Sequence, residues 1–449
     1  MSSPVMKSSR ELLAAPVLKS AISKTARRLM PMIVLLYVVA FLDRSNVGFA
    51  QAALGVDRGV SAGAYALGAG IFFIGYAIFE IPSNLMMQKI GAKIWLARIA
   101  ITWGLVSASF AFVQGPNSFV AMRFVLGVTE AGLFPGIIMY LALWFPNKVR
   151  VQMFAIFYLA QPFSQLVGAP LSGWLLNVGD RIPGWHGWQL MFGVEGLLAV
   201  AAGIAALFFL INGPEKATFL SVPERDALRE VMALEHSTKQ ESGPNGILAA
   251  MRNGRVWYFT IIYFCLQVAV YGVTFYLPTQ VSELTGTKVG FKVGLLVAIP
   301  WFFGIFACYF IGKAANTVRK RRQFGTVLFL TTGLCIFGSA WAGTNHQPVI
   351  GLIFITLAVC SFLGVGPVTW AYPTAFLAGT AAATGIGLIN SLGNLGGFVA
   401  PILRTDVNSM AHSTTGSAGI YALGVLPFLA AAMMYFTRRF SNKADALLD

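Results

Sequence analysis

Long, continuous apolar runs dominate the chain, and short polar stretches separate them. Most runs extend over about 20 residues without the alternation of apolar and polar positions that marks a half-buried strand. A helix of about 20 apolar residues spans the hydrocarbon core of a bilayer, whereas barrel strands are about half as long. Only helices and closed barrels satisfy every backbone hydrogen bond in lipid. We therefore predict twelve transmembrane helices, at residues 30–53, 62–87, 94–113, 118–145, 151–178, 188–211, 256–283, 289–313, 324–343, 348–373, 378–404 and 417–438.

Composition supports an all-α membrane protein. Of the 449 residues, 57% are hydrophobic and only 11% are charged, whereas soluble domains contain about 25% charged residues. Too little polar surface remains to cover a water-soluble globule, so a lipid bilayer must surround much of the chain.

The basic residues fall mostly in connections on one side of the predicted membrane. If both termini are cytoplasmic, 25 of the 32 Lys and Arg residues face the cytoplasm, five face the opposite side, and Arg44 and Arg123 lie inside helices. Cytoplasmic loops are enriched in basic residues, so this asymmetry predicts cytoplasmic termini. It also explains the formal net charge of +15, and we expect no nucleic-acid partner.

The longest polar connection divides the predicted helices into two sets of six. Residues 222–236 within it repeat apolar positions with a helical period, which indicates an amphipathic helix. Basic connections after the second helix of each half favour two repeated halves, although simple positive-inside loops would leave the same trace. The predicted units are a cytoplasmic tail (1–29), an N-terminal six-helix bundle (30–211), a cytoplasmic central loop (212–255), a C-terminal six-helix bundle (256–438) and a second cytoplasmic tail (439–449).

Four ionisable side chains interrupt apolar helices of the first half. Asp43 and Arg44 lie in the first segment, and Arg123 and Glu130 lie seven residues apart on one face of the fourth. A charge within the bilayer is costly and marks a functional site by default. The second half has no acidic residue at mid-membrane depth, and all four histidines lie in loops. We therefore expect the proton site to lie in the first half.

These residue types can couple an anion to a proton. A buried carboxylate remote from cations takes up a proton readily, whereas a nearby arginine keeps it ionised. Arginine stays charged but can leave its carboxylate partner for a substrate carboxylate, which it binds through two N–H groups. We predict that Asp43 and Glu130 couple protons and that Arg44 binds the anion. Arg123 is either a second anion contact or the resting partner of a carboxylate. The alternative is a structural ion pair between the first and fourth helices.

Glu80 and Glu195 also interrupt apolar runs, and we interpret both as structural. Neutral polar side chains within the helices can bind substrate hydroxyls, although such groups also join helices in membranes. The predicted substrate-binding set, besides the two arginines, is Tyr76, Gln161, Gln267, Tyr271, Asn390, Asn394 and Trp370.

Enzyme chemistry has no support in the sequence. No HExxH pattern and no nucleophile–base pair is present, and the four cysteines have no paired spacing, so they are interpreted as small buried hydrophobic residues. We expect no catalytic residue, no metal and no cofactor, with protons as the coupling ion.

Several segments of the first half resemble the anion:cation symporter family of the major facilitator superfamily: FLDRSNVGFA (41–50), AYALGAGIFFIGYAIFEIPSN (64–84), RFVLGVTEAGLFPG (123–136), WFPNKVR (144–150) and GWQLMFGVEGLLA (187–199). The second half, at 252–281, 286–291 and 397–404, is similar to the bacterial L-rhamnonate and sugar-acid branch. This resemblance implies proton symport of a carboxylate by alternating access. It further implies that Asp43 and Glu130 titrate, and that Arg44, Tyr76, Gln161 and Gln267 contact the substrate. Phe41 departs from the galactonate branch, which has tyrosine there.

The sequence thus predicts a secondary active transporter of the bacterial inner membrane that imports a small organic anion with protons, as a monomer. The expected substrate is a sugar acid such as L-rhamnonate or another aldonate. Symport of tartrate, phthalate or another aromatic or dicarboxylic acid is the alternative, and proton-coupled export is a further one.

Overall fold

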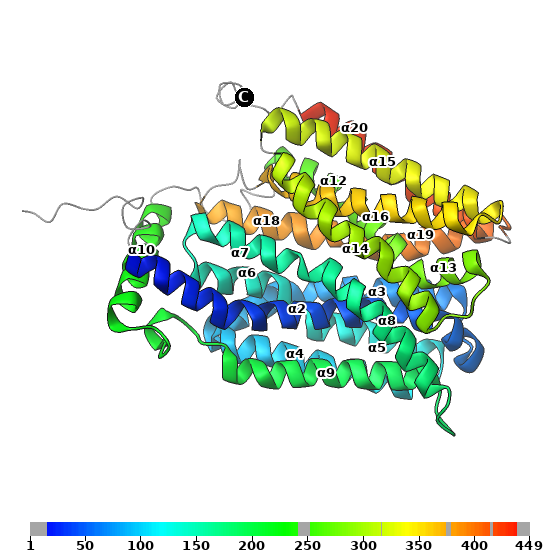
Figure 1. Cartoon of the computed structure of the whole chain (residues 1–449), viewed down its shortest axis with the longest axis horizontal. Coiled ribbons are helices and arrows are strands. Elements are labelled where there is room, and N and C mark those ends of the chain that lie inside the picture. The colour runs from blue at the N-terminus through cyan, green and yellow to red at the C-terminus, as the bar shows by residue number, and fades with distance from the viewer. Residues whose placement is uncertain (1–15, 241–251, 316, 374–378, 414–415, 438–449) are drawn as a thin grey trace, which may run out of the picture.

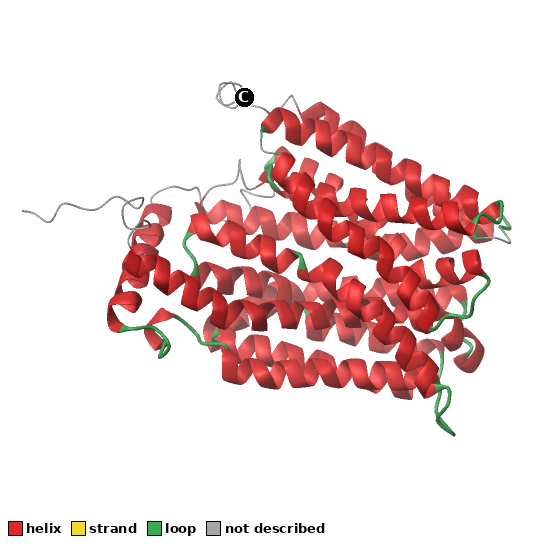
Figure 2. Ribbon diagram, in the orientation of Figure 1, coloured by secondary structure: helices red, strands yellow, loops and turns green. Residues whose placement is uncertain are grey.

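The computed structural model describes residues 16–240, 252–315, 317–373, 379–413 and 416–437. Figure 2 shows helices joined by short loops, and the described residues contain no strand. Most helices lie side by side along the longest axis of the molecule (Figure 1). The all-helical class predicted from the sequence is confirmed.

The first half contains helices α2 to α9, the central segment contains α10, and the second half contains α12 to α20. Their bounds are α2 (Pro16–Arg58), α3 (Ala62–Ile90), α4 (Ala92–Ser109), α5 (Pro116–Glu130), α6 (Leu133–Trp144), α7 (Asn147–Tyr158), α8 (Ala160–Gly179), α9 (Gly187–Phe209), α10 (Val222–Gln240), α12 (Gly254–Thr274), α13 (Leu277–Thr285), α14 (Phe291–Ala314), α15 (Val318–Thr344), α16 (Pro348–Trp370), α18 (Gly379–Asn394), α19 (Gly396–Met410) and α20 (Ser417–Phe436). Two short 3-10 turns lie at Phe110–Phe112 and Pro214–Lys216.

Eleven helical segments of the described chain are long and apolar enough to cross a membrane. The predicted segment 151–178 is the one outside this set. It is helical too, but it is divided at Leu159 between α7 and α8, and α8 contains Gln161, Ser164, Gln165 and Ser172. Its polar content lowers its hydropathy, and these side chains face the protein interior, since all four are buried.

A break in the fourth predicted segment places Glu130 at the end of α5. Gly132 adopts a left-handed conformation, with φ of +90°, which glycine tolerates best. A Cβ at this position would collide with the Ser83 side chain. Pro135 follows in the first turn of α6 and has no N–H to continue the α5 hydrogen-bond ladder. The carboxylate therefore projects from a helix end and not from the middle of one continuous helix.

The two halves pack against each other along α8 with α14 and along α3 with α19. They are in close contact at the end of the molecule that lies opposite α10, near α13 (Figure 1). There the Tyr65 hydroxyl donates a hydrogen bond to the Phe275 carbonyl oxygen over 3.0 Å. A Cβ at Gly48 would lie only 2.6 Å from that same oxygen. The backbones of the two halves therefore meet directly at this end.

The helix α10 occupies the central segment, where the sequence predicts an amphipathic helix, and it packs on the first turns of α2. α2 begins at Pro16, within the range expected for the N-terminal tail. Glu224 accepts hydrogen bonds from Lys24 Nζ at 3.0 Å and Ser20 Oγ at 2.6 Å. Lys24, Ser20 and the Ser221 backbone lower the pKa of Glu224 to about 2. Glu224 is therefore ionised at neutral pH and ties α10 to α2.

Candidate substrate and proton site

A central cavity lies between the two halves, with about 370 Å³ of space free of atoms, including where it opens to solvent. The first half contributes Tyr37, Phe41, Arg44, Tyr76, Phe134, Tyr158 and Gln161, and the second half contributes Tyr263, Gln267, Tyr271, Asn390 and Asn394. Seven of the predicted substrate-binding residues are among these, so the structure brings most of that set together.

Arg44 and Glu130 form an ion pair at this cavity. Nη2 and Nε of Arg44 lie 2.6 and 2.7 Å from Glu130 Oε1, so the pair joins α2 to the end of α5. Glu130 is fully buried, and its second oxygen, Oε2, has no hydrogen-bond partner among the described residues. Hydrogen bonds between charged groups are stronger than neutral ones, and this pair holds the guanidinium of the cavity-lining Arg44.

Arg44 also contacts aromatic rings and the other half of the molecule. Its guanidinium carbon lies 5.1 Å from the ring centres of Phe41 and Tyr76 and 5.4 Å from that of Phe72. Such rings attract a cation through their negative faces. Nη1 donates a long hydrogen bond of 3.4 Å to the Tyr271 hydroxyl in α12. One guanidinium therefore connects the charged first half to the polar wall of the second half.

Asp43 points away from the cavity, although it is the neighbour of Arg44 in sequence. Successive helix positions are about 100° apart, so adjacent side chains leave the helix in different directions. Asp43 Oδ2 accepts from Trp103 Nε1, and Oδ1 accepts from Ser107 Oγ, both at 2.8 Å. Both donors belong to α4, on the far side of α2 from the cavity. Asp43 and Glu130 therefore occupy different environments, one with neutral donors and one with an arginine.

Arg123 does not line the cavity, and no carboxylate of the described residues lies at salt-bridge distance from it. Its Nε donates to the Gly68 carbonyl at 3.2 Å, and its Nη2 donates to the Ala69 carbonyl at 3.4 Å. The guanidinium also lies 5.1 Å from the Phe72 ring centre. Neither role expected for Arg123 is seen in this arrangement, where it attaches α5 to the backbone of α3.

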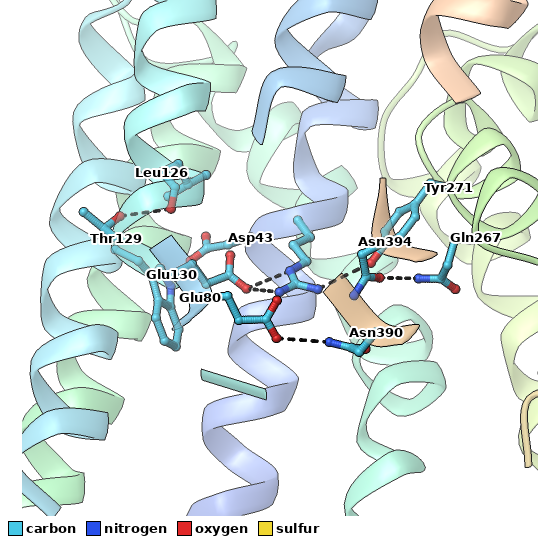
Figure 3. A network of polar contacts seen from close by, with 11 residues as sticks. Asp43, Glu80, Leu126, Thr129, Glu130, Gln267, Tyr271, Asn390 and Asn394 are labelled. Atoms are coloured by element: carbon cyan, nitrogen blue, oxygen red, sulfur yellow. Dashed lines mark hydrogen bonds and ion pairs between the residues drawn. The ribbon is translucent and has the colours of Figure 1, made fainter. Parts of the chain in front are cut away.

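Neutral amides form the second-half wall of the cavity. Gln267 Nε2 donates to Asn394 Oδ1 at 2.6 Å, which joins α12 to α18. Asn390 Nδ2 donates to Glu80 Oε1 at 3.3 Å, and Ser391 Oγ donates to Glu80 Oε2 at 2.5 Å. Glu80, interpreted from sequence as structural, thus joins α3 of the first half to α18 of the second (Figure 3).

Trp370 lies one layer outside the cavity lining. Its ring packs edge-on against that of Tyr263, with ring centres 4.9 Å apart. Sequence reasoning missed four aromatic lining residues, Tyr37, Phe134, Tyr158 and Tyr263. A signal existed for Tyr37, which precedes Arg44 by two helical turns and therefore shares its face. The other three lie in apolar runs where an aromatic side chain gives no distinguishing sign.

Comparison with known proteins agrees with this architecture. Residues 33–401 match the model of the Major Facilitator Superfamily. The chain is 40% identical over 95% of its length to the inner membrane transport protein RhmT of Escherichia coli (strain K12), of which it covers 97%. It is 41% identical over 89% of its length to a protein of Agrobacterium vitis named "Putative tartrate transporter", of which it covers 90%. It is also 35% identical over 93% of its length to the quinolone resistance transporter of Acinetobacter baumannii, of which it covers 94%.

These relatives are membrane transporters and not enzymes, which confirms the predicted class of protein. The eleven apolar helices and the bacterial relatives together identify a multi-pass protein of the bacterial inner membrane. Family model, relatives and helical architecture lead to one conclusion: the chain belongs to the major facilitator superfamily, as the resemblance of its sequence predicted.

Proposed function

We propose that the protein imports a small organic anion together with protons, and that Arg44 exchanges Glu130 for the anion during each cycle. The ion pair between Arg44 and Glu130 at the cavity carries this proposal. An arginine fork binds a carboxylate through two N–H groups, so Arg44 suits a substrate carboxylate as well as it suits Glu130.

The exchange couples the two ligands because Arg44 and Glu130 are each unfavourable as an unpaired buried charge. Removing one member of a buried ion pair costs about 3–5 kcal/mol when the other charge stays uncompensated. A substrate carboxylate on Arg44 compensates the guanidinium. A proton on Glu130 neutralises the carboxylate that has lost its arginine. The state with both ligands bound is therefore favoured over a state with either ligand alone, which is the thermodynamic basis of symport.

The second half supplies orientation for a hydroxylated acid. Gln267 and Asn394 offer amide donors and acceptors, and Tyr271 offers a hydroxyl, all facing the same cavity as Arg44. The preferred substrate is accordingly a sugar acid such as L-rhamnonate or another aldonate. The relative named for tartrate supports a hydroxylated dicarboxylate as the alternative, and the aromatic lining suits phthalate or another aromatic acid.

Import by alternating access requires the two bundles, 30–211 and 256–438, to move against each other around this cavity. If α10 and the polar ends of the chain are cytoplasmic, as the positive-inside rule predicts, the closed contact of Tyr65 with Phe275 lies on the outer side. The cavity then faces inward in this arrangement. Substrate would enter after these outer contacts separate.

Export is the second candidate function, and the relative named as a quinolone resistance transporter favours it. The aromatic lining residues could hold a flat ring system. A cationic drug, however, would face an unfavourable guanidinium at Arg44. The test of the substrate class therefore includes a quinolone as well as the sugar acids and dicarboxylates.

Thermal-shift measurement of the purified protein tests the substrate class. A ligand that binds the folded state raises apparent stability by mass action. The panel contains rhamnonate, galactonate, other aldonates, glucuronate, tartrate, phthalate and a quinolone. We expect an aldonate to stabilise the protein and Arg44→Ala to abolish that stabilisation.

A matched control is Arg58→Ala, which removes an arginine of the same helix outside the cavity lining and should keep the response. Stabilisation by dicarboxylates alone would move the substrate to the tartrate class. Stabilisation by the quinolone and by none of the other acids of the panel would contradict the proposal.

A further inference from the structure

Two buried acidic side chains form a pair on the side of α2 away from the cavity. Asp43 is 1% exposed and Glu195, in α9, is fully buried. Asn46 stands between them: its Nδ2 donates to Glu195 Oε2 at 2.8 Å and to Asp43 Oδ1 at 3.4 Å. One amide group therefore contacts both carboxyl groups.

Only neutral donors contact these two carboxyl groups. Besides Asn46, Asp43 accepts from Trp103 and Ser107, and Glu195 accepts from Ser172 Oγ at 2.6 Å. No ion pair at salt-bridge distance to either carboxyl is present among the described residues. A buried carboxylate is normally compensated by a cation or neutralised by a proton.

The helices around the pair supply few other charges. The sequence of α8 contains no ionisable residue, and Glu195 is the only one in α9. The charged groups that act on Asp43 from farther away are Glu130 and Arg123, which have opposite signs. Arg123 already donates to the carbonyls of α3. Lys93 lies near the opposite end of α4 from Ser107, and Arg98 precedes Ser107 by about two and a half helical turns.

The Asn46 amide brings the two carboxyl groups to one nitrogen atom. Asn46 is 1% exposed, and its Oδ1 has no hydrogen-bond partner in the described structure, while its Nδ2 serves two acceptors. A buried acceptor left unpaired costs about 1–3 kcal/mol. An amide N–H group donates to an ionised carboxylate and to the carbonyl oxygen of a protonated carboxyl alike, so Nδ2 can keep both contacts whichever acid carries a proton. Two buried carboxyl groups that share one amide nitrogen, with no cation at salt-bridge distance, favour a proton on one of them.

We propose that Asp43 and Glu195 hold one proton between them across Asn46, so that Glu195 belongs to the proton-binding machinery. Two carboxyl groups close together in a low-dielectric site do not both ionise. The proton that they retain is therefore a property of the pair and not of one residue. Its transfer breaks the O–H bond of one carboxyl group and forms that of the other, and the pair keeps a charge of −1. This replaces the structural interpretation of Glu195 made from sequence.

The part this pair plays in transport rests on the proposed proton symport. Asn46 lies about one helical turn beyond Asp43 on α2, towards the closed end of the molecule. The pair therefore extends the proton site from the neighbourhood of Glu130 towards α9. Charge on Asp43, set by Glu195, acts on Glu130 through space.

Infrared spectroscopy of the purified full-length protein in lipid tests the shared proton without substrate or transport. The carboxylic C=O band of Asp43, identified by its loss in Asp43→Asn, is followed across pH. In Glu195→Gln the neighbouring negative charge is gone, so Asp43 should lose its proton at a pH lower by about one unit or more. Glu80→Gln, which removes a buried carboxyl elsewhere, should leave the Asp43 midpoint unchanged.

A milder variant covers the case in which Glu195→Gln does not fold. Ser172→Ala removes a donor that touches Glu195 but not Asp43, so Glu195 holds the shared proton more tightly and the Asp43 midpoint again falls, by less. An Asp43 midpoint that neither variant moves would overturn the proposal and return Glu195 to a structural role. Failure of proton symport itself would appear instead in flux measurements, with the infrared shift still present.

Discussion

The two halves of the molecule differ in the chemistry that they bring to the cavity. The first half contributes the cavity's arginine and the carboxylate paired with it, and it also contains the buried pair Asp43 and Glu195. The second half contributes tyrosines and amides. Its buried arginine, Arg404, stacks on Tyr276 at 3.9 Å, near the closed end.

Under the proposed function, this difference divides two tasks between the halves. Charge and proton binding require groups whose ionisation responds to a partner, and the groups proposed for this task all lie in the first half. Selection among similar acids requires hydrogen bonds to hydroxyl groups, which neutral amides provide without altering the charge balance. Movement of one bundle relative to the other can then change access while the proton site stays intact.

Glu130→Gln should have the largest effect, because it removes the carboxylate that exchanges with the anion. We expect accumulation driven by a pH gradient to be lost, while counterflow exchange of labelled substrate persists. Uptake by proteoliposomes measures both. Glu283→Gln, a carboxyl of the second half, is the matched control and should retain accumulation. Equal loss of accumulation and exchange in Glu130→Gln would instead indicate that the ion pair only holds the helices together.

Arg44→Lys should weaken substrate binding about 10- to 100-fold, because a point charge replaces a planar fork that binds a carboxylate at two positions. This corresponds to about 1.5–3 kcal/mol, the range for a hydrogen bond to a charged group. Calorimetric titration gives the dissociation constant. Arg404→Lys, the same change in the second half, should alter it little. Equal effects of the two substitutions on the dissociation constant would contradict the assignment of anion binding to Arg44 of the first half.

Gln267→Ala should have a smaller effect, about 3- to 10-fold on the affinity for a hydroxylated acid. The expected signature is selectivity: the variant should lose affinity for an aldonate but bind a deoxy analogue nearly as well as the parent protein does. Asn394→Ala, combined with Gln267→Ala in a double-mutant cycle, should show that the bonded pair acts as a unit. Loss of the same factor for every ligand would mean that the pair shapes the wall without contacting hydroxyls.

Glu224→Gln should have the smallest effect, because the side chain of its ion-pair partner Lys24 is half exposed, and ion pairs open to solvent contribute about 0–1 kcal/mol. The pKa of Glu224 is lowered to about 2, so its contribution is present above the pKa of the unfolded chain and is lost only as the pH falls towards 2. Hydrogen exchange of α10 should therefore change little between neutral and mildly acidic pH. A large loss of uptake in this variant would show that α10 takes part in the transport cycle.

Much of the fold follows from hydropathy alone, because lipid permits few alternatives to a helix. The breaks at Gly132 and Leu159 were not predicted, since a hydropathy profile averages over the residues at which a helix ends. The break after Glu130 matters for the site, because it places that side chain at the end of α5, where it pairs with Arg44.

The sequence predicted many of the residues that lie at the cavity, but it did not predict which side chains contact each other. Adjacent positions suggested that Asp43 and Arg44 share a site, yet a helix points them to different sides of α2. Arg123 shares a helix face with Glu130, but the carbonyls of α3 take up its donors. The sequence shows which residues lie at membrane depth, whereas partners on other helices decide what each one does.

The most direct test of the account is proton movement driven by the substrate. Proteoliposomes containing the purified protein and an internal pH indicator receive an inward gradient of the anion identified by thermal shift, with no applied pH gradient. Acidification of the interior that is absent in Glu130→Gln, although that variant still exchanges substrate, is the predicted result. Entry of the anion into proteoliposomes of the unaltered protein without acidification would contradict proton symport through the pair of Arg44 and Glu130.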